Sequence, residues 1–363
     1  MVWEKFNLGE ICENLDSKRV PITKKDRKEG QIPYYGASGI VDYVADYIFD
    51  DDLLLVSEDG ANLLARTYPI AFSITGKTWV NNHAHVLKFN SPTTQSFIEY
   101  YLNTISLSDY VSGMAQPKLN QKSLNSILVP YPPEAEQKRI VAILDQAFAE
   151  IDKARTNAEQ NLKNARELFN SYSQKVFSQG GDGWINMTVG EVLSLEYGKP
   201  LDKSVRKEDG LYPAYGANGV KCRSDSYYCD FKSIIVGRKG SAGELTISEE
   251  RFWPLDVTYF VKFDIEKHDL YFIYYLLSLL NLPNLATGVK PGINRNNVYS
   301  IGVSIPDIMT QKDVATKLFA LSKEVTRLEK IYKLKLLSLN ELKKSILQKA
   351  FSGELTNSKG LAA

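Results

Sequence analysis

The sequence is poor in residues and motifs that carry catalysis. It has three cysteines and three histidines among 363 residues, and Cys12, Cys222 and Cys229 have no metal-ligand spacing and leave an odd thiol. There is no Gly-x-x-x-x-Gly-Lys-Ser/Thr loop for a nucleoside triphosphate and no Asn/Asp-Pro-Pro-Tyr motif of the adenine methyltransferase type. These absences argue against a nuclease or methyltransferase acting by itself, and we expect this chain to have no catalytic residue and no metal or cofactor of its own.

Long hydrophobic segments are also missing. The start, Met1-Val2-Trp3-Glu4-Lys5, does not have the pattern of a signal peptide. The apolar run from Tyr271 to Leu282 is too short to cross a bilayer. We therefore expect a reduced, soluble, cytoplasmic protein with no membrane partner.

The sequence has almost no net charge. It contains 44 basic and 43 acidic residues, with 12 against 15 in residues 1–133, 14 against 15 in residues 181–306, and 11 against 6 in residues 307–363. A strongly basic nucleic-acid binder would show a large positive excess. Any such surface on the globular parts must therefore be a local patch.

The dominant feature is a tandem repeat that covers the whole chain. Pro33-Tyr34-Tyr35-Gly36-Ala37-Ser38-Gly39 recurs as Pro213-Ala214-Tyr215-Gly216-Ala217-Asn218-Gly219, and Pro117-Lys118-Leu119-Asn120 recurs as Pro291-Gly292-Ile293-Asn294. The second copy is about six residues shorter in its middle. A duplication of this length predicts two similar modules with an approximate two-fold relation.

Each copy divides into a β-rich module and a long helix. Short apolar runs between turn residues from Ile32 to Phe89 indicate strands, and Leu270–Leu280 has helical character like its counterpart from Ser96 to Leu102. We expect these helices to cover one side of a sheet. The predicted boundaries are a first module at 1–133, a long helix at 134–180, a second module at 181–306, a second long helix at 307–355 and a flexible tail at 356–363.

Apolar residues in both long segments repeat at intervals of four and three, which is the spacing of a coiled-coil seam. In the first segment it runs from Ile140 to Val176, and in the second it includes Lys335, Leu339 and Leu342. Each helix would be on the order of 65 Å long. Such a helix often mediates homodimerisation, but here the two helices of one chain can pair with each other.

Antiparallel pairing within the chain would separate the two modules by a rigid rod. The sequence thus predicts an α+β protein in which two similar mixed α/β domains lie at opposite ends of a long antiparallel two-helix coiled coil, with an internal pseudo-two-fold repeat. Two similar modules at a fixed distance suit a long regular partner such as double-stranded DNA, whose helical turn is about 34 Å.

These motifs, in this order, resemble the specificity subunit of type I restriction-modification systems. The resemblance rests on the two Tyr-Gly-Ala-Ser/Asn-Gly turns, on Asn82-His83-Ala84-His85-Val86-Leu87, on Gln116-Pro117-Lys118-Leu119-Asn120, and on the proline-rich stretch from Val129 to Pro133 that leads into Glu136-Gln137. It covers essentially the whole chain, and the repeated order is more specific than any single motif.

The resemblance implies a non-catalytic DNA reader whose two modules are target-recognition domains. The long helices would be spacers that also dock two methyltransferase subunits, with two restriction subunits in the full complex. S-adenosylmethionine, ATP and Mg would be bound by those partners, and none by this chain.

The modules carry opposite charges at equivalent positions. Glu58 and Asp59 in the first module correspond to Arg238 and Lys239 in the second. Arginine and lysine suit guanine or a phosphate, whereas a carboxylate can accept a hydrogen bond from cytosine N4. We hypothesise that the modules read different half-sites, although these loops could equally be solvated turns; a hairpin is the expected structure of Gly237–Gly243.

Further candidate DNA contacts fall into three groups. Asn81, Asn82 and His83, with His85, form a polar cluster that could read adenine or could satisfy buried backbone groups. Two basic loops and one recurring loop could contact phosphates, or could be solvated or structural turns. The candidates in these loops and in the second glycine turn are Lys18, Arg19, Lys24, Lys25, Lys203, Arg206, Lys207, Lys118, Asn120, Lys122, Lys290, Asn294, Arg295 and Asn218.

A protein scaffold is the rival hypothesis. A rod with two protein-binding heads would also explain the near-neutral modules. A DNA reader should lose affinity steeply with added salt, because bound cations are released from the phosphates.

Overall fold

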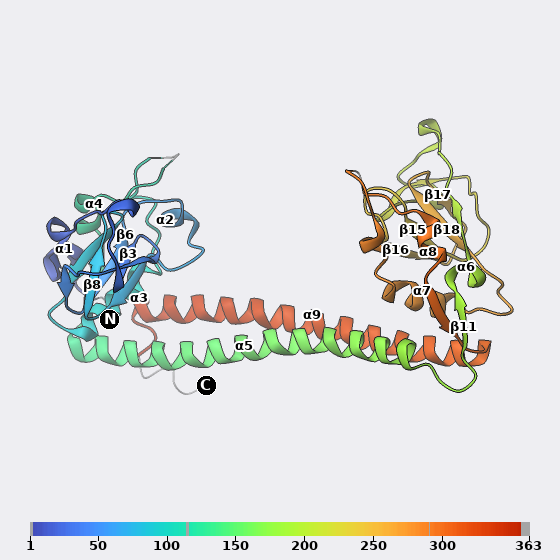
Figure 1. Ribbon diagram of the computed structural model, residues 1–363. Helices are drawn as coiled ribbons and strands as arrows, with labels where there is room; N and C mark the ends of the chain where they lie inside the picture. Colours follow the sequence, from blue (N-terminus) through green and yellow to red (C-terminus); the bar gives the residue numbers. More distant parts are fainter. Residues whose placement is uncertain (1–2, 114–115, 290, 357–363) are drawn as a thin grey trace. The chain divides into compact units, whose positions relative to one another are not determined.

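The computed structural model describes residues 3–113, 116–289 and 291–356 (Figure 1). The chain forms two compact units, one made of Met1–Ala158 with Leu334–Ala363 and the other of Glu159–Lys333. We call them unit 1 and unit 2, and they contain the first and second module respectively. Residues 357–363 of the predicted tail lie outside the described residues.

The two modules have the same order of elements, apart from β5 and α2, which occur only in the first module among the described residues. In the first module these are β1 (Lys5–Asn7), α1 (Leu8–Ile11), β2 (Glu13–Asn14), β3 (Glu29–Gly36), β4 (Gly39–Val44), β5 (Phe49–Asp50), β6 (Leu53–Ser57), α2 (Asn62–Ala65), β7 (Ala71–Ile74), β8 (Lys77–Val80), β9 (Ala84–Lys88), α3 (Pro92–Leu102), α4 (Gln121–Asn125) and β10 (Leu128–Pro130). In the second they are β11 (Ile185–Thr188), α6 (Val189–Val192), β12 (Ser194–Tyr197), β13 (Tyr212–Gly216), β14 (Gly219–Ser224), β15 (Ser233–Gly237), β16 (Leu245–Ser248), β17 (Trp253–Pro254), β18 (Thr258–Lys262), α7 (Leu270–Leu279), α8 (Arg295–Tyr299) and β19 (Gly302–Ile305). Short 3-10 helices occur at η1 (Asp16–Lys18), η2 (Lys24–Asp26), η3 (Lys203–Val205) and η4 (Leu282–Leu285).

The sheets repeat as well. The order β2-β9-β6-β7 in the first module matches β12-β18-β15-β16 in the second, and β4-β3-β8-β5 matches β14-β13-β17. The difference in length lies between β6 and β7, where the first module inserts α2, whereas β15 and β16 form a direct hairpin. The hairpin expected at Gly237–Gly243 is thereby confirmed.

Alternate side chains of the strand β6 belong to two different hydrophobic cores. Leu54 and Val56 of β6 pack with Phe97 of α3, and Leu53 and Leu55 point the other way toward Phe49 and Val80 of the second sheet. Successive strand residues face opposite sides of a sheet, so β6 is buried on both faces. The helix α3 therefore covers one side of the sheet, as the sequence predicted.

The glycine turns are tight hairpins. Gly39 and Gly219 begin the second strand of each hairpin with φ angles of +118° and +105°. Side chains with a Cβ atom disfavour this region, which explains why glycine occupies both positions.

A buried glutamine fastens each module to the start of a long helix. α5 (Glu134–Gln179) and α9 (Ile308–Ser352) begin just after proline residues. Gln137 donates to Pro132 O at 2.8 Å and accepts from Thr94 at 2.8 Å. Gln311 donates to Pro306 O at 2.8 Å and accepts from the Asp269 amide at 2.9 Å. Both side chains are fully buried, so the two junctions share one design.

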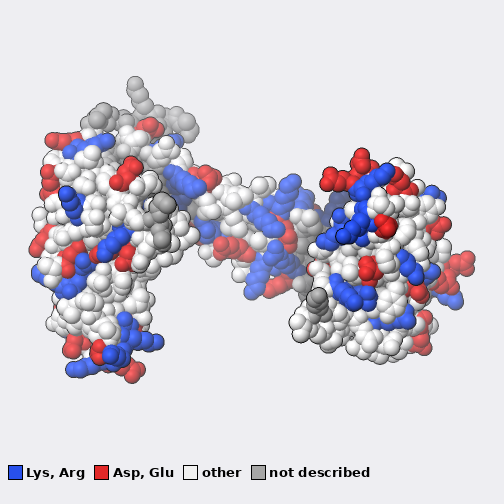
Figure 2. Space-filling view, turned by 90° about the horizontal axis from the view of Figure 1, so that it is seen from above, with Lys and Arg blue, Asp and Glu red and all other residues white. Residues whose placement is uncertain are grey.

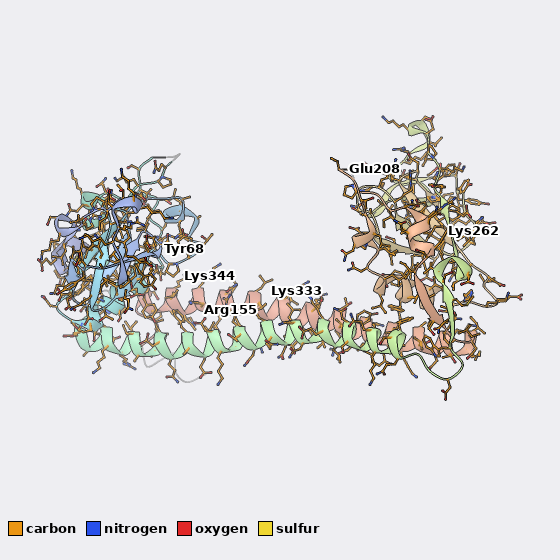
Figure 3. All side chains as sticks on the ribbon, viewed as in Figure 1. Tyr68, Arg155, Glu208, Lys262, Lys333 and Lys344 are labelled. Atoms are coloured by element: carbon orange, nitrogen blue, oxygen red, sulfur yellow. The ribbon has the colours of Figure 1, made fainter. Side chains whose placement is uncertain are left out.

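Within each unit the segments of α5 and α9 run antiparallel. In unit 1, Arg155, labelled in Figure 3, donates to Asn340, and the Lys343 ammonium lies 4.5 Å from the centre of the Phe148 ring. In unit 2, Arg166 pairs with Glu329 at 2.7 Å. Pairing of the two helices within the chain is thus observed in both units.

The predicted seam is wrong at two positions near the end of α9. Leu339 and Ile346 pack against the core as predicted, but Lys335 and Leu342 are exposed, and Leu336, Lys343 and Ala350 also turn toward the interior. A helix with 3.6 residues per turn drifts by about 20° per heptad relative to a strict seven-residue repeat. At the two failed positions the inward-facing residue is consequently the next one along the helix, Leu336 or Lys343.

Candidate nucleic-acid interface

Two loops that are distant in sequence meet in each module. The Leu119 amide donates to Glu58 O at 2.8 Å, and the Gly60 amide donates to Pro117 O at 3.0 Å. The second module repeats both bonds, from Ile293 to Arg238 O at 3.0 Å and from Gly240 to Pro291 O at 3.0 Å. The segment that carries Glu58 or Arg238 and the recurring loop, residues 117–120 or 291–294, therefore form one continuous site.

In the first module this site is a network of paired charges. Glu58 accepts from Arg19 Nη1 at 2.7 Å through one oxygen and lies 3.1 Å from Lys118 Nζ through the other. Arg19 also donates to Ala84 O at 2.8 Å. Both oxygens of Glu58 thus have partners within the protein, so its carboxylate is neutralised before any ligand arrives.

A second carboxylate, Asp16, completes the network. His85 Nδ1 lies 2.5 Å from Asp16 Oδ2, and His85 Nε2 lies 2.7 Å from Leu119 O. Both neighbours are acceptors, and the ring can donate to both only as the imidazolium. The expectation that His85 satisfies a buried backbone group is confirmed.

The network holds both acids ionised. Burial alone would raise the pKa of Asp16, but the hydrogen bond from His85 and its charge bring that pKa below the usual value. Burial likewise acts to raise the pKa of Glu58, and the Arg19 bond and the His85 charge lower it overall. Each acid is therefore a carboxylate at neutral pH.

Asp16, Glu58 and His85 have ligand atoms within 4.8 Å of one another, which is the spacing of a metal site. The Arg19 guanidinium, however, contacts both carboxylates, and both ring nitrogens of His85 already have partners. This donor set is used for internal bonds and does not fit a metal ion.

The second module fills the same position with aromatic rings and arginines. By strand register His85 corresponds to Tyr259 and Asp16 to Tyr197. Tyr259 donates its hydroxyl to Ile293 O at 3.0 Å, just as His85 contacts Leu119 O. Burial raises the pKa of Tyr259 to about 12, so the hydroxyl stays a donor.

Several predicted contacts have structural roles. Asn120 and Asn294 cap α4 and α8 by accepting from the amides of Ser123 and Asn296. Arg206 donates to Leu201 O, Lys207 pairs with Asp225, Asn81 accepts from the His83 amide, and His83 pairs with Asp59 at 2.8 Å. These bonds occupy groups that the sequence offered to DNA, and for the loop asparagines they fit the structural turn that was the alternative.

Other candidates are exposed. Six exposed lysines form no ion pair among the described residues: Lys18, Lys24, Lys25, Lys122, Lys203 and Lys239. Asn82 and Asn218 are open to solvent. Lys290 lies outside the described residues. Figure 2 shows basic and acidic side chains intermixed on the visible face of each module.

The sequence did not point to Asp16, Tyr197 or Tyr259 as members of the site. Tyr197 and Tyr259 lie in paired strands and Asp16 follows directly after β2, and the register that brings each to a partner some 60 to 70 positions away is not visible in the sequence. Burial raises the pKa of the thiols of Cys12 and Cys229 to about 12, so neither is a ready nucleophile.

None of the described helices is long and apolar enough to cross a membrane.

A duplicated module with a polar loop site, followed in each copy by a long helix, defines a class of paired recognition proteins. Comparison with known families agrees: the type I restriction modification DNA specificity domain matches residues 2–160 and again 181–337. The chain belongs to this family.

Curated relatives and solved structures give the same result. A putative type I restriction enzyme specificity subunit of Haemophilus influenzae is 35% identical over 142 residues, covering 39% of this chain and 36% of the relative. A type I restriction enzyme specificity subunit of Methanocaldococcus jannaschii is 22% identical, covering 97% of this chain and 93% of the relative.

Two solved structures share the fold. One, from a study of complex assembly and conformational transition of the type I restriction-modification system, has a TM-score of 0.72 at 17% identity and covers 97% of this chain and 98% of its own. The HsdS subunit from Thermoanaerobacter tengcongensis has a TM-score of 0.59 at 16% identity, with 98% and 97% covered.

Proposed function

We propose that this chain is the non-catalytic DNA-recognition subunit of a type I restriction-modification complex, and that each module reads one half of an asymmetric two-part site. The observation that carries the proposal is the pair of homologous loops with different chemistry. Glu58 and Arg238 hold the same backbone bond to the recurring loop, but the Glu58 charge is balanced by Arg19 and Lys118, whereas Arg238 lies against the rings of Tyr197 and Tyr259. Two copies of one fold with different surfaces at one position suit two different half-sites.

The helices would set the distance between those half-sites. The antiparallel contacts seen separately in the two units, Arg155 with Asn340 and Arg166 with Glu329, support one continuous two-helix coiled coil with a module at each end. In such a rod the gap between the half-sites is fixed by helix length.

The partners follow from family membership. We propose that two methyltransferase subunits dock on the helices and that two restriction subunits join the full complex in the cytoplasm. S-adenosylmethionine, ATP and Mg would belong to those subunits. The similar solved structure with a TM-score of 0.72 comes from work on the assembly of a type I system, which supports a multisubunit setting.

The test is a methylation map. The chain is co-expressed with its methyltransferase, and N6-methyladenine is located across the host genome by long-read sequencing. We expect a two-part asymmetric motif with a fixed unspecified gap. Replacing residues 181–306 by the equivalent module of another specificity subunit should change one half of the motif and leave the other half unchanged.

Replacing residues 1–133 is the matched control and should change the opposite half. A soluble complex with an active methyltransferase but no motif would contradict DNA recognition and favour the protein scaffold. A motif altered in both halves by one replacement would contradict the assignment of one half-site to each module.

A further inference from the structure

The second module contains two arginines without a counter-charge at the site where the first module is self-neutralised. The carbon at the centre of the Arg238 guanidinium lies 5.3 Å from the centre of the Tyr197 ring, and that of Arg295 lies 4.9 Å from the same ring. Arginine stacks well on aromatic faces while its N–H edge remains available. Two cations are therefore held around one tyrosine.

No acidic side chain among the described residues forms an ion pair with these arginines. The ion pairs of the second module join other residues, namely Lys207 with Asp225, Lys232 with Glu249 and Lys267 with Asp264. The neighbouring Lys239 is exposed and adds a third positive charge. Like charges gathered without a carboxylate repel one another, and an anion placed between them would remove that repulsion.

Backbone contacts fix the direction of both side chains. Arg238 Nη2 donates to Asp256 O at 2.6 Å, and Arg295 Nη1 lies 3.3 Å from Leu195 O. Arg238 Nε is buried and has no partner among the described residues. A buried N–H group without an acceptor costs free energy, so the other contacts of Arg238 must offset the cost of holding the side chain in this position.

The equivalent residues of the first module show the contrast. Glu58 stands where Arg238 stands, and Gln121 stands where Arg295 stands, donating to Asn14 at 2.8 Å. Asn14 and Leu195 occupy matching positions in β2 and β12. The first module thus has one buried carboxylate and a neutral amide where the second has two cations.

We propose that Arg238 and Arg295 together bind one phosphodiester group of the DNA backbone, and that the first module has no equivalent phosphate site. This inference rests on the proposed function, because it presumes that the modules meet DNA. A phosphate has several oxygens and can accept from two guanidinium groups, whereas one guanine edge is filled by a single arginine. The arginine pair would then position the second module on DNA without reading sequence.

The experiment measures DNA affinity over a range of salt concentrations. The full chain is purified with its methyltransferase subunits, and binding is measured on a duplex that carries the mapped motif. Each lost phosphate contact should reduce the magnitude of the slope of log affinity against log salt by about 1. We expect a reduction for Arg238→Gln and for Arg295→Gln, and because the two arginines share one phosphate a double variant should lose no more than about 1 in total. The methylation motif should be unchanged in these variants.

Two further variants serve as controls. Arg238→Lys keeps the charge and should retain the slope. Lys267→Gln removes an exposed charge in the same module, from a lysine paired with Asp264 at 3.4 Å, and should also retain it. Thermal unfolding of each complex shows whether a variant is folded, and Arg295→Gln tests the site independently if Arg238→Gln is unstable.

Two results would overturn the proposal, and a third would refute the function on which it rests. An unchanged slope in both glutamine variants would show that the arginines do not touch phosphate. A motif that relaxes at one base position while the slope stays constant would make Arg238 a base reader. A wild-type complex with no motif and no salt-dependent binding would instead refute the proposed function itself.

Discussion

At the scale of single residues, Glu58 and Arg238 show how one backbone framework supports two kinds of chemistry. Glu58 lies among Arg19, Lys118 and His85, so its charge is balanced inside the protein. Arg238 lies against two tyrosine rings and has no acidic partner among the described residues. The first module therefore depends on ionised carboxylates, and the second does not depend on them at this position.

We expect the first module to lose stability in acid. The pKa values of Asp16 and Glu58 are lowered in the folded state, so their contribution is fully present above the unfolded values, which are about 4. It is lost as the pH falls through the lower folded values, because protonation removes the pairs with His85 and Arg19. Hydrogen exchange of β6 amides, corrected for the intrinsic rate, should accelerate below about pH 4.

The variant Glu58→Gln should already show faster exchange at pH 7, with a weaker dependence on pH. It leaves the Arg19 charge without its carboxylate and should destabilise the module by about 1 to 3 kcal/mol. Glu29→Gln changes an exposed acid without an ion pair among the described residues and is the matched control. Equal acid sensitivity in wild type and Glu58→Gln would contradict this account.

The sequence could not predict how individual candidates are used. It offered Arg19, Glu58 and Asn120 as DNA contacts because their residue types suit bases and phosphates. The structure gives all three internal partners, and those partners come from distant strands or from a helix end. Conversely, Tyr197 and Tyr259 looked like ordinary strand residues until the register placed them together.

At the scale of elements, the junction between module and helix is the best-defined feature. Gln137 and Gln311 lie one turn into α5 and α9, and each bonds to a proline carbonyl before its helix. The side-chain oxygen of each accepts from the segment that starts the covering helix, at Thr94 or at Asp269. A single buried amide thus ties the sheet-covering helix, the proline turn and the long helix together.

Substitution of this amide should loosen one module on its helix. Gln137→Leu removes both bonds and leaves Pro132 O and the Thr94 hydroxyl without their partner, at a cost of about 1 to 3 kcal/mol per buried group. Thermal unfolding should shift to lower temperature, and limited proteolysis should cut first near residue 133. Gln146→Leu, at an exposed position of α5, should change neither result.

The sequence predicted the secondary-structure elements better than it predicted the contacts of individual residues. The glycine turns, the prolines before α5 and α9 and the shorter middle of the second copy all have direct signals, and the structure places each where it was expected. The seam of α9 failed at Lys335 and Leu342 because apolar residues continue on the exposed face, with Leu334 and Leu337 also open to solvent. Periodicity alone could not choose between neighbouring rows of leucines.

At the scale of the whole molecule, the proposed rod makes gap length a function of helix length. Four residues inserted into α5 and four into α9, between the Arg155–Asn340 and Arg166–Glu329 contacts, would lengthen the rod by about 6 Å. A four-residue insertion preserves the apolar seam approximately. The methylation motif should keep both half-sites and gain about one or two unspecified base pairs, at 3.4 Å each.

The insertion in α5 alone is the control. It shifts the helices out of register and should lower the melting temperature and abolish methylation. An unchanged gap with insertions in both helices would show that something other than the helices sets the spacing.

The equivalent carbonyl groups of Leu119 and Ile293 are bound by different side chains in the two modules. A histidine contacts the first and a tyrosine the second, and each donor is accompanied by its own neighbours, Asp16 with His85 and Tyr197 with Tyr259. Exchanging a single residue between the two modules would leave a buried charge or hydroxyl without its partner. Transferring the chemistry of this site from one module to the other therefore requires four substitutions at once, at the positions occupied by Asp16, Glu58, His85 and Gln121 in one copy and by Tyr197, Arg238, Tyr259 and Arg295 in the other.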